Sequence, residues 1–426
     1  MQFRSFLQTN RVYLDGGTGT LLQQAGLPSS ELPERWNVTH PDVIKGIHKA
    51  YFDAGSNVVA TNTFGANTVK YSQEELERVI RAGIENARTA ANDSVGTQEK
   101  FVALDIGPTG KLLKPYGTLD FDSAVEIFAQ TVRLGVKYGV DLILIETMSD
   151  CYETKAAVLA AKENSDLPIL VSNAYEGSGK LMTGASALVM TTILEGLGVD
   201  GFGMNCSLGP KLLQPVAQEV LNNASLPVLI KPNAGLPITE NGVTRYDVDA
   251  QMFADEMYGF VALGARIVGG CCGTTPAHIA ALVEKTKDLP VQPIADNAKP
   301  YVASYIRVAN AESGLEGGLE TGAAIPSALD VDIDTIIDEA FEQKAEGVEI
   351  LHVCINGEGA IDSLSFIVES IQEVLDLPIC LQSDNLVALE KAMRRYNGKP
   401  LIKCGEGQTL SDLLLLVQKY GGVCIR

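Results

Sequence analysis

Eight short apolar runs, spread along the chain up to residue 272, constrain its fold more than any other feature. Each run ends in small or polar residues, and the runs lie at 12–17, 58–63, 101–107, 142–147, 168–173, 203–206, 228–233 and 267–272. Continuous apolar runs without polar alternation are typical of parallel strands that are covered on both faces. Several segments between the runs have apolar residues at helical spacing and are predicted as helices: 42–54, 123–138, 154–162 and 250–263.

Eight strand-then-helix units in succession predict an α/β protein with a (β/α)₈ barrel. A doubly wound open sheet would show the same local pattern and stays open as the alternative fold. The glycine-rich turn at 15–20 lacks the GxGxxG spacing, so it gives little support to dinucleotide binding. In a barrel the carboxyl ends of the strands converge on one face, and that face holds the active site. Polar residues at strand ends are therefore the candidates for function.

Three cysteines stand at such strand ends. Cys271 and Cys272 end the last run among glycines, and Cys206 ends the sixth run. Adjacent side chains of a strand point to opposite faces, so both meet one partner only where the backbone bends, and glycines make that bend easy. Three thiolates with one open position are expected of a catalytic zinc site. Taken alone, the pair is also compatible with a strained disulfide between neighbours or with inert core thiols.

The neighbouring strand ends favour the metal interpretation. In the predicted barrel, Cys206 ends the sixth strand, Asn233 the seventh, and the cysteine pair the eighth. Three adjacent strands would then present two or three sulfurs and one amide oxygen to a single point. We therefore expect a metal site at this edge of the barrel.

The net charge and the cysteine content exclude several classes of function. A net charge of −20 at pH 7 argues against binding to nucleic acid or to anionic membrane surfaces. No apolar run approaches the length of a membrane span, and residues 1–11 lack the apolar core of a signal peptide. Eight cysteines spread over 426 residues do not resemble a disulfide framework. These observations predict a cytoplasmic protein whose thiolates are available to a metal.

A second domain is expected after the barrel. Residues 290–300 contain three prolines and no helical periodicity, so we predict a barrel at 1–289, a linker at 290–300 and a second domain at 301–426. That domain opens with a strand-like segment, 301–308, and continues as alternating strands and helices. Its later apolar runs lie at 348–354, 378–381, 400–404 and 422–426. Four such units cannot close an eight-stranded ring, so the prediction is a truncated half-barrel.

Seven short motifs together resemble the homocysteine S-methyltransferase family. They occur in the family's order at 14–20, 61–67, 105–110, 145–147, 205–207, 232–235 and 269–273. The likeness covers residues 1 to about 289 and is strongest to the homocysteine module of cobalamin-dependent methionine synthase. This resemblance implies a zinc-dependent (β/α)₈ barrel that binds homocysteine.

The resemblance also implies roles for individual residues. It makes Cys206, Cys271 and Cys272 the zinc ligands and Asn233 a residue that can fill the fourth position before the substrate arrives. A second group would bind the amino-acid end of homocysteine: Asp15, Gly16, Gly17 and Glu146. Three further strand-end residues are weaker candidates for substrate contact, since they could equally satisfy loop amides: Asn62, Thr63 and Asp105.

Residues 301–426 resemble the first half of the folate-binding barrel that follows the homocysteine module in methionine synthase. Segments 344–353, 395–402 and 419–422 carry this likeness. The family's Asp-Val-Asn, however, is here 352–354 (His-Val-Cys), and its Asn-Ser is here 403–404 (Lys-Cys). Asp384 is the one acid that could remain from the pterin site. These departures argue against folate binding and favour an interaction role, such as a homodimer formed through 301–426.

The implied reaction is displacement of a methyl group by the homocysteine sulfur, which yields methionine. A zinc-bound thiol is a thiolate, so zinc would supply the nucleophile. The cobalamin-binding signature Asp-x-His-x-x-Gly is missing from the chain, so methylcobalamin is expected on a separate corrinoid protein. Direct transfer from S-methylmethionine or a betaine-like donor is the enzymatic alternative. A non-catalytic, zinc-bearing subunit of a corrinoid methyltransferase system is the alternative from another class.

Overall fold

A computed structural model describes residues 2–240, 243–312, 319–320, 332–357, 359–405 and 407–425. The chain divides into two compact units. The barrel unit consists of Met1–Thr183 and Val199–Asn297, and the C-terminal unit consists of Gly184–Gly198 and Ala298–Arg426. The C-terminal unit thus includes α8 (Ala187–Leu197), a helix that lies between two barrel strands in the sequence. The boundaries 1–289, 290–300 and 301–426 expected from the sequence stay a prediction.

The barrel unit contains a ring of eight parallel strands. The strands are β1 (Val12–Tyr13), β2 (Val58–Ala60), β3 (Phe101–Ile106), β4 (Leu142–Met148), β5 (Ile169–Asn173), β6 (Gly201–Asn205), β7 (Val228–Lys231) and β10 (Ile267–Val268). Their order is β1-β10-β7-β6-β5-β4-β3-β2, and a parallel bridge between Leu14 and Val58 joins the two ends. The predicted barrel is confirmed, and the open doubly wound sheet is wrong.

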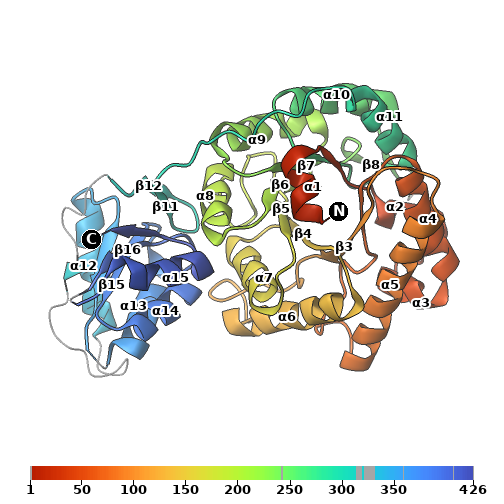
Figure 1. The fold of residues 1–426 in the computed structure, drawn as a ribbon. Coiled ribbons are helices and arrows are strands. Elements are labelled where there is room, and N and C mark those ends of the chain that lie inside the picture. Colours follow the sequence, from red (N-terminus) through yellow and green to blue (C-terminus); the bar gives the residue numbers. More distant parts are fainter. Residues whose placement is uncertain are drawn as a thin grey trace. The chain divides into compact units, whose positions relative to one another are not determined.

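Helices surround these strands (Figure 1). The helices of the barrel unit are α1 (Phe3–Thr9), α2 (Thr18–Gln24), α3 (Trp36–Thr39), α4 (Pro41–Asp53), α5 (Gln73–Asp93), α6 (Phe121–Tyr138), α7 (Cys151–Asn164), α9 (Pro210–Asn223), α10 (Ala250–Ala262) and α11 (Pro276–Thr286), with a 3₁₀ turn, η1, at Pro33–Arg35. The four helices predicted from periodicity are confirmed as α4, α6, α7 and α10. None of the helices in the described ranges combines the length and apolar character needed to cross a lipid bilayer.

The first helix closes one end of the ring. Phe3, Phe6 and Leu7 of α1 are buried against the residues that begin the strands, such as Leu142 and Leu229. The rings of Phe3 and Phe101 meet edge to face, with centroids 5.2 Å apart. Because α1 fills the amino-terminal end, the carboxyl ends of the strands form the other, polar end. An antiparallel hairpin, β8 (Pro237–Glu240) and β9 (Val243–Tyr246), lies in the loop after β7 at that polar end.

The C-terminal unit holds a five-stranded parallel sheet. Its strands, in sheet order, are β13 (Leu319–Glu320), β14 (Leu351–Cys354), β15 (Ile379–Ser383), β16 (Leu401–Cys404) and β17 (Val423–Ile425). Its helices, besides α8, are α12 (Ile333–Ala345), α13 (Ala360–Val374), α14 (Leu386–Arg395) and α15 (Leu410–Tyr420). This open sheet agrees with the predicted half-barrel of β/α units.

The strand predicted at 301–308 is wrong. The segment instead forms an antiparallel hairpin of β11 (Tyr301–Ala303) and β12 (Val308–Asn310). The chain reverses because the Oγ atom of Ser304 accepts hydrogen bonds from the backbone N–H groups of Ile306 (3.4 Å) and Arg307 (3.1 Å). The hairpin and α8 pack together within the C-terminal unit.

Candidate functional site

The structure brings the three predicted cysteines together. The Sγ atoms of Cys206 and Cys272 lie 3.9 Å apart, and the three sulfurs are all within 4.8 Å of one another. All three cysteines are free thiols, and a disulfide would require sulfurs at about 2.0 Å. The interpretation of Cys271 and Cys272 as a disulfide is therefore wrong.

Backbone geometry at the ends of three strands gathers the sulfurs. The N–H of Cys206, after β6, donates to the carbonyl of Lys231 (3.2 Å), and the N–H of Cys271, after β10, donates to that of Pro232 (2.8 Å). Both loops are thus fixed to the end of β7, which lies between them. Cys206 adopts a left-handed φ of 60°, and Ser207 a φ of 56°. Such angles are costly for residues other than glycine, and they persist where the surrounding structure holds them.

Asn233 lies beside this cluster. Its side chain is buried, and its Oδ1 atom accepts a hydrogen bond from the backbone N–H of Cys272 at 3.1 Å. Because an amide oxygen has two lone pairs, this contact leaves it one further acceptor position. The role of Asn233 as a metal ligand stays a prediction.

The glycines after β1 allow the chain to approach the cysteine loop closely. A Cβ atom on Gly17 would lie 2.7 Å from the carbonyl oxygen of Cys271, and one on Gly16 would lie 2.6 Å from Oγ1 of Thr274. The N–H of Gly17 donates to that same Oγ1 atom at 3.1 Å. Any side chain at either position would push the first strand end away from the sulfurs.

Three acids and a lysine lie buried at the same end of the barrel. Asp15 follows β1, Asp105 is on β3 and Glu146 on β4, and all three are less than 10% exposed. Lys231, the last residue of β7, places its Nζ 2.8 Å from Oε2 of Glu146 and 3.4 Å from Oδ1 of Asp15. The sequence analysis missed Lys231, although it is the only charged residue in the apolar run at 228–233.

The electrostatics of this group follow from burial and mutual contact. Burial raises the pKa of Asp15 to about 6, against the opposing charge of Lys231. Burial and the charge of Glu146 hold the pKa of Asp105 well above its usual range. Burial lowers the pKa of Lys231, but Glu146 and Asp15 outweigh it and hold that pKa well above the ordinary value. Oδ1 of Asp105 is buried and has no hydrogen-bond partner among the described residues.

Asn62 and Thr63 serve the loop after β2. Oγ1 of Thr63 donates to the carbonyl of Asp105 (2.8 Å), and Nδ2 of Asn62 donates to the carbonyl of Pro33 (2.8 Å) and to Oδ1 of Asn37 (3.0 Å). These contacts fit the simpler expectation that both side chains satisfy loop groups. Their assignment to substrate binding stays a prediction.

Asn205 is a further residue that the sequence analysis passed over. Its Oδ1 accepts from the N–H of Thr147 and from Oγ of Ser172, both at 2.8 Å. Its Nδ2 donates to Oγ1 of Thr147 at 2.7 Å and lies 3.7 Å from Sγ of Cys271. Asn205 thus links the end of β4, which carries Glu146, to the sulfur cluster. Its place directly before a strand-end cysteine was the available signal.

The thiols are protonated without a cation. The hydrogen bond of Cys206 with Cys271 lowers its pKa, but contact with Cys272 and burial bring that pKa up to about 11. For Cys272 the contact with Cys206 lowers the pKa, whereas Cys271 and burial raise it to about 12. Tyr246 of β9 packs its ring against Gly273 beside this cluster. The site is therefore a cluster of neutral thiols that a soft divalent cation would convert to thiolates.

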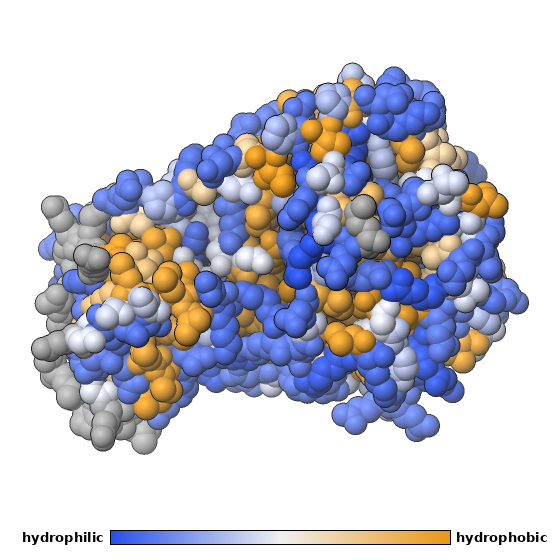
Figure 2. All heavy atoms as spheres, in the orientation of Figure 1, coloured by the Kyte–Doolittle hydropathy of each residue, from blue (hydrophilic) through white to orange (hydrophobic). Residues whose placement is uncertain are grey.

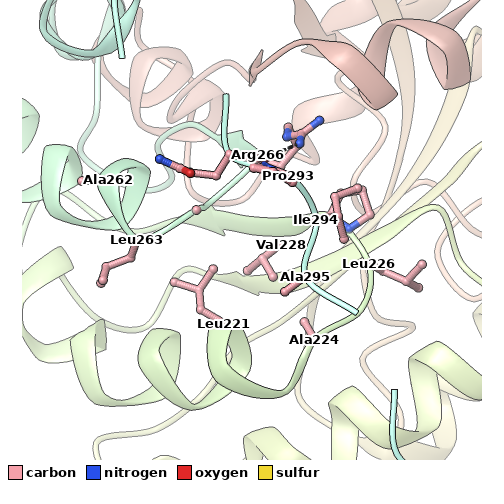
Figure 3. Close-up of a pocket in the computed structure, with 13 residues that line it drawn as sticks. Leu221, Ala224, Leu226, Val228, Ala262, Leu263, Arg266, Pro293, Ile294 and Ala295 are labelled. Carbon is pink, nitrogen blue, oxygen red and sulfur yellow. Dashed lines mark hydrogen bonds between the residues drawn. The ribbon is translucent and has the colours of Figure 1, made fainter. Parts of the chain in front are cut away.

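A separate cavity lies at the opposite, amino-terminal end of the strands (Figure 3). It encloses about 410 Å³ and is lined by residues that precede β7 and β10 and by the segment 292–295. Arg266 borders it, but its guanidinium donates to the carbonyls of Leu7, Gln8 and Gln292. None of its lining residues belongs to the sulfur cluster or to the acids beside it.

Comparison with known proteins identifies the family. The sequence model of the homocysteine S-methyltransferase family matches residues 12–286. The chain belongs to the homocysteine S-methyltransferase family. The matched range includes every residue of the candidate site. The resemblance drawn from the motifs is therefore confirmed.

Two curated relatives extend the likeness over nearly the whole chain. The methionine synthase of Mycobacterium tuberculosis (strain ATCC 25618 / H37Rv) is 28% identical over 455 residues, which cover 96% of this chain and 37% of that protein. The methionine synthase of Mycobacterium leprae (strain TN) is 29% identical over 420 residues, which cover 91% and 35%. The chain therefore spans little more than a third of the length of these family members.

Solved structures show the same fold. The homocysteine methyltransferase MmuM from Escherichia coli, in a metallated form, is 23% identical with a TM-score of 0.57, covering 67% of this chain and 99% of that one. Its apo form is 24% identical with a TM-score of 0.53, covering 66% and 97%. At this identity the likeness supports the barrel architecture alone.

Proposed function

We propose that this protein transfers a methyl group to the thiol of homocysteine, giving methionine, at a zinc site formed by Cys206, Cys271 and Cys272. The close approach of the three sulfurs at the carboxyl end of the barrel carries the proposal. Sulfurs about 2.3 Å from a tetrahedral zinc ion lie about 3.8 Å apart. The 3.9 Å between the sulfurs of Cys206 and Cys272 fits that requirement. When bound there, zinc would hold the substrate sulfur as a thiolate.

The charges beside the sulfurs support an amino-acid substrate. Two carboxylates, those of Asp15 and Glu146, face the single ammonium group of Lys231, so an added ammonium group reduces the excess of negative charge. Oδ1 of Asp105 is a buried acceptor without a partner, which the substrate ammonium would satisfy. We assign the amino-acid end of homocysteine to Asp15, Glu146 and Asp105, with Gly16 and Gly17 giving it room. Its thiol then reaches the sulfur cluster.

In the proposed reaction the homocysteine sulfur attacks the donor's methyl carbon. A new S–CH₃ bond forms, the bond between methyl and donor breaks with its electron pair left on the donor, and the thiol proton passes to solvent. We propose methylcobalamin carried on a separate corrinoid protein as the donor, and the 426 residues contain no Asp-x-His-x-x-Gly that would hold it themselves. The competing proposals remain S-methylmethionine or a betaine-like donor, and a zinc-bearing subunit without turnover. The free thiols of this chain suit a reducing compartment, and we propose that the protein is cytoplasmic.

A donor comparison tests this function. The purified chain, loaded with zinc, is incubated with homocysteine and one donor at a time: methylcobalamin, S-methylmethionine, a betaine or methyltetrahydrofolate. We expect methionine from methylcobalamin, and we expect Cys206→Ser to lose bound zinc and at least about 100-fold in activity. As a control, Ser94→Ala, at a half-buried serine of the barrel unit, should match the wild type. Methionine formation that survives in Cys206→Ser would refute the zinc mechanism.

We also propose that residues 301–426 do not bind folate. Two residues that stand where the family has pterin contacts, His352 and Cys404, both bind Gln382. Nε2 of His352 lies 2.8 Å from Oε1 of Gln382, and Nε2 of Gln382 donates to the carbonyl of Cys404 at 3.2 Å. Oδ1 of Asp384 accepts the N–H of Gly357 at 2.9 Å. Tight binding of methyltetrahydrofolate by the full chain would contradict this proposal.

A further inference from the structure

The side chain of Lys231 forms a link across the barrel that the proposed zinc and methyl chemistry leaves unexplained. Lys231 is 2% exposed, and its Nζ contacts Glu146 on β4 and Asp15 after β1. In the ring, β10 separates β7 from β1, and β6 and β5 separate β7 from β4. One ammonium group therefore joins two carboxylates that come from distant parts of the wall.

This link fixes both carboxylates. The second oxygen of Asp15 accepts the backbone N–H of Ala60 at 2.9 Å, so that carboxylate is held by β2 and by Lys231. Oε2 of Glu146 is held by Lys231 at 2.8 Å. Breaking a buried ion pair by removing one partner leaves an uncompensated buried charge, which makes the remaining group move or change its hydration. The positions of Glu146 and Asp15 thus depend on Lys231.

We propose that Lys231 is a positioning residue, which holds Glu146 and Asp15 at the separation at which they accept the ammonium group of the substrate. This inference rests on the proposed function. Each carboxylate has acceptor capacity for more than one donor, so the lysine and the substrate can share the pair. Lys231 acts through these two acids and has no part in the transfer of the methyl group.

Steady-state kinetics of Lys231→Met and Lys231→Arg test the proposal. Loss of binding that is equal in ground state and transition state raises KM and leaves kcat unchanged. We therefore expect K231M to raise KM for homocysteine about tenfold or more, with kcat within about threefold, and K231R to recover part of the loss because it keeps the charge. Lys399→Met, which removes a half-buried lysine in the C-terminal unit, is the control and should leave KM unchanged.

A double-mutant cycle separates positioning from general damage to the fold. If Lys231 acts through Glu146 and Asp15, K231M added to the Asp15→Asn/Glu146→Gln variant should raise KM by less than about twofold further, whereas independent effects would multiply. Multiplied effects, or a K231M variant with the KM of the wild type, overturn the proposal. Should K231M fail to fold, Lys231→Gln takes its place, because it also removes the charge, and an unchanged KM in that variant has the same consequence.

Calorimetric titration with homocysteine measures substrate binding without turnover, so it tests the role of Lys231 separately from the proposed reaction. A wild-type protein that binds homocysteine without forming methionine would refute the methyl transfer, yet weaker binding by K231M would still support Lys231 as a positioning residue. Equal homocysteine affinity in the wild type and K231M would refute the role of Lys231 while the reaction stands. Zinc content and thermal unfolding are measured alongside and should match the wild type.

Discussion

At the scale of single residues, three residues with strained backbone angles lie around the side-chain amide of Asn205. The described chain has three residues other than glycine with positive φ, namely Thr147, Cys206 and Ser207. Each such residue costs about 1–3 kcal/mol. Asn205 precedes two of them in sequence and hydrogen-bonds to both the N–H and the Oγ1 of the third. The strained ends of β4 and β6 are thus stabilised together, and Nδ2 of Asn205 is directed at the sulfur of Cys271.

Asn205→Asp tests this arrangement with little change of shape. The substitution removes the N–H donors toward Thr147 and Cys271 and places a carboxylate beside the thiolates. We expect affinity for zinc to fall about 10- to 100-fold, as for other groups that orient metal ligands. Competition with a chromogenic chelator measures it, with the exposed Asn222→Asp as the control. An unchanged zinc affinity would show that the amide contributes nothing to the cluster.

At the scale of helices and strands, the sequence predicted what depends on local pattern. Continuous apolar runs identified the barrel strands, because both faces of a parallel strand are buried, and strand ends placed Cys206 beside the cysteine pair. Lys231 and Asn205 were missed because their partners lie on other strands, up to 85 residues away for Lys231 and Glu146. The segment 301–308 was misjudged because one side chain, that of Ser304, reverses an otherwise strand-like stretch. Inclusion of α8 in the C-terminal unit likewise depends on tertiary contacts.

The helix α4 carries a buried titratable group whose effect on stability has a definite sign. His48 is fully buried, and neither ring nitrogen has a hydrogen-bond partner among the described residues. Burial lowers its pKa from 6.5 to about 4. In the unfolded chain His48 binds a proton below about pH 6.5, whereas in the folded chain it does so only below about pH 4. The free energy of unfolding therefore falls as pH falls through this window.

We expect His48 to lower the unfolding free energy of the wild type by up to about 3 kcal/mol between pH 7.5 and pH 4.5. Urea unfolding at a series of pH values measures the loss. His48→Leu, which cannot take up a proton, should flatten the dependence by that amount, whereas His40→Leu at an exposed position should not. Parallel curves for the wild type and His48→Leu would contradict the assignment.

At the scale of the whole molecule, the two units differ in what the family explains. The family match covers residues 12–286 and includes every strand of the barrel, whereas residues 298–426 of the C-terminal unit lie beyond it. The latter also carries exposed apolar side chains, and Figure 2 shows such side chains gathered over this unit. On α15, Leu414 is 50% and Leu415 72% exposed. Exposed apolar patches of this kind mark interaction surfaces.

The proposed homodimer through 301–426 is testable on this helix. The edge strand β17 pairs with β16 on one side, so among the described strands its other edge and the neighbouring face of α15 are the surface that a second copy would cover. We expect the full chain to sediment as a dimer and Leu415→Asp to weaken association at least about tenfold, because it places a charge in an apolar contact. Leu212 on α9 is about as exposed as Leu414, and Leu212→Asp should leave the dimer intact. Zinc content should be equal in all three proteins, since the sulfur cluster lies in the barrel unit. A wild-type chain that sediments as a monomer at every concentration would refute the dimer and leave the methyl-transfer proposal standing.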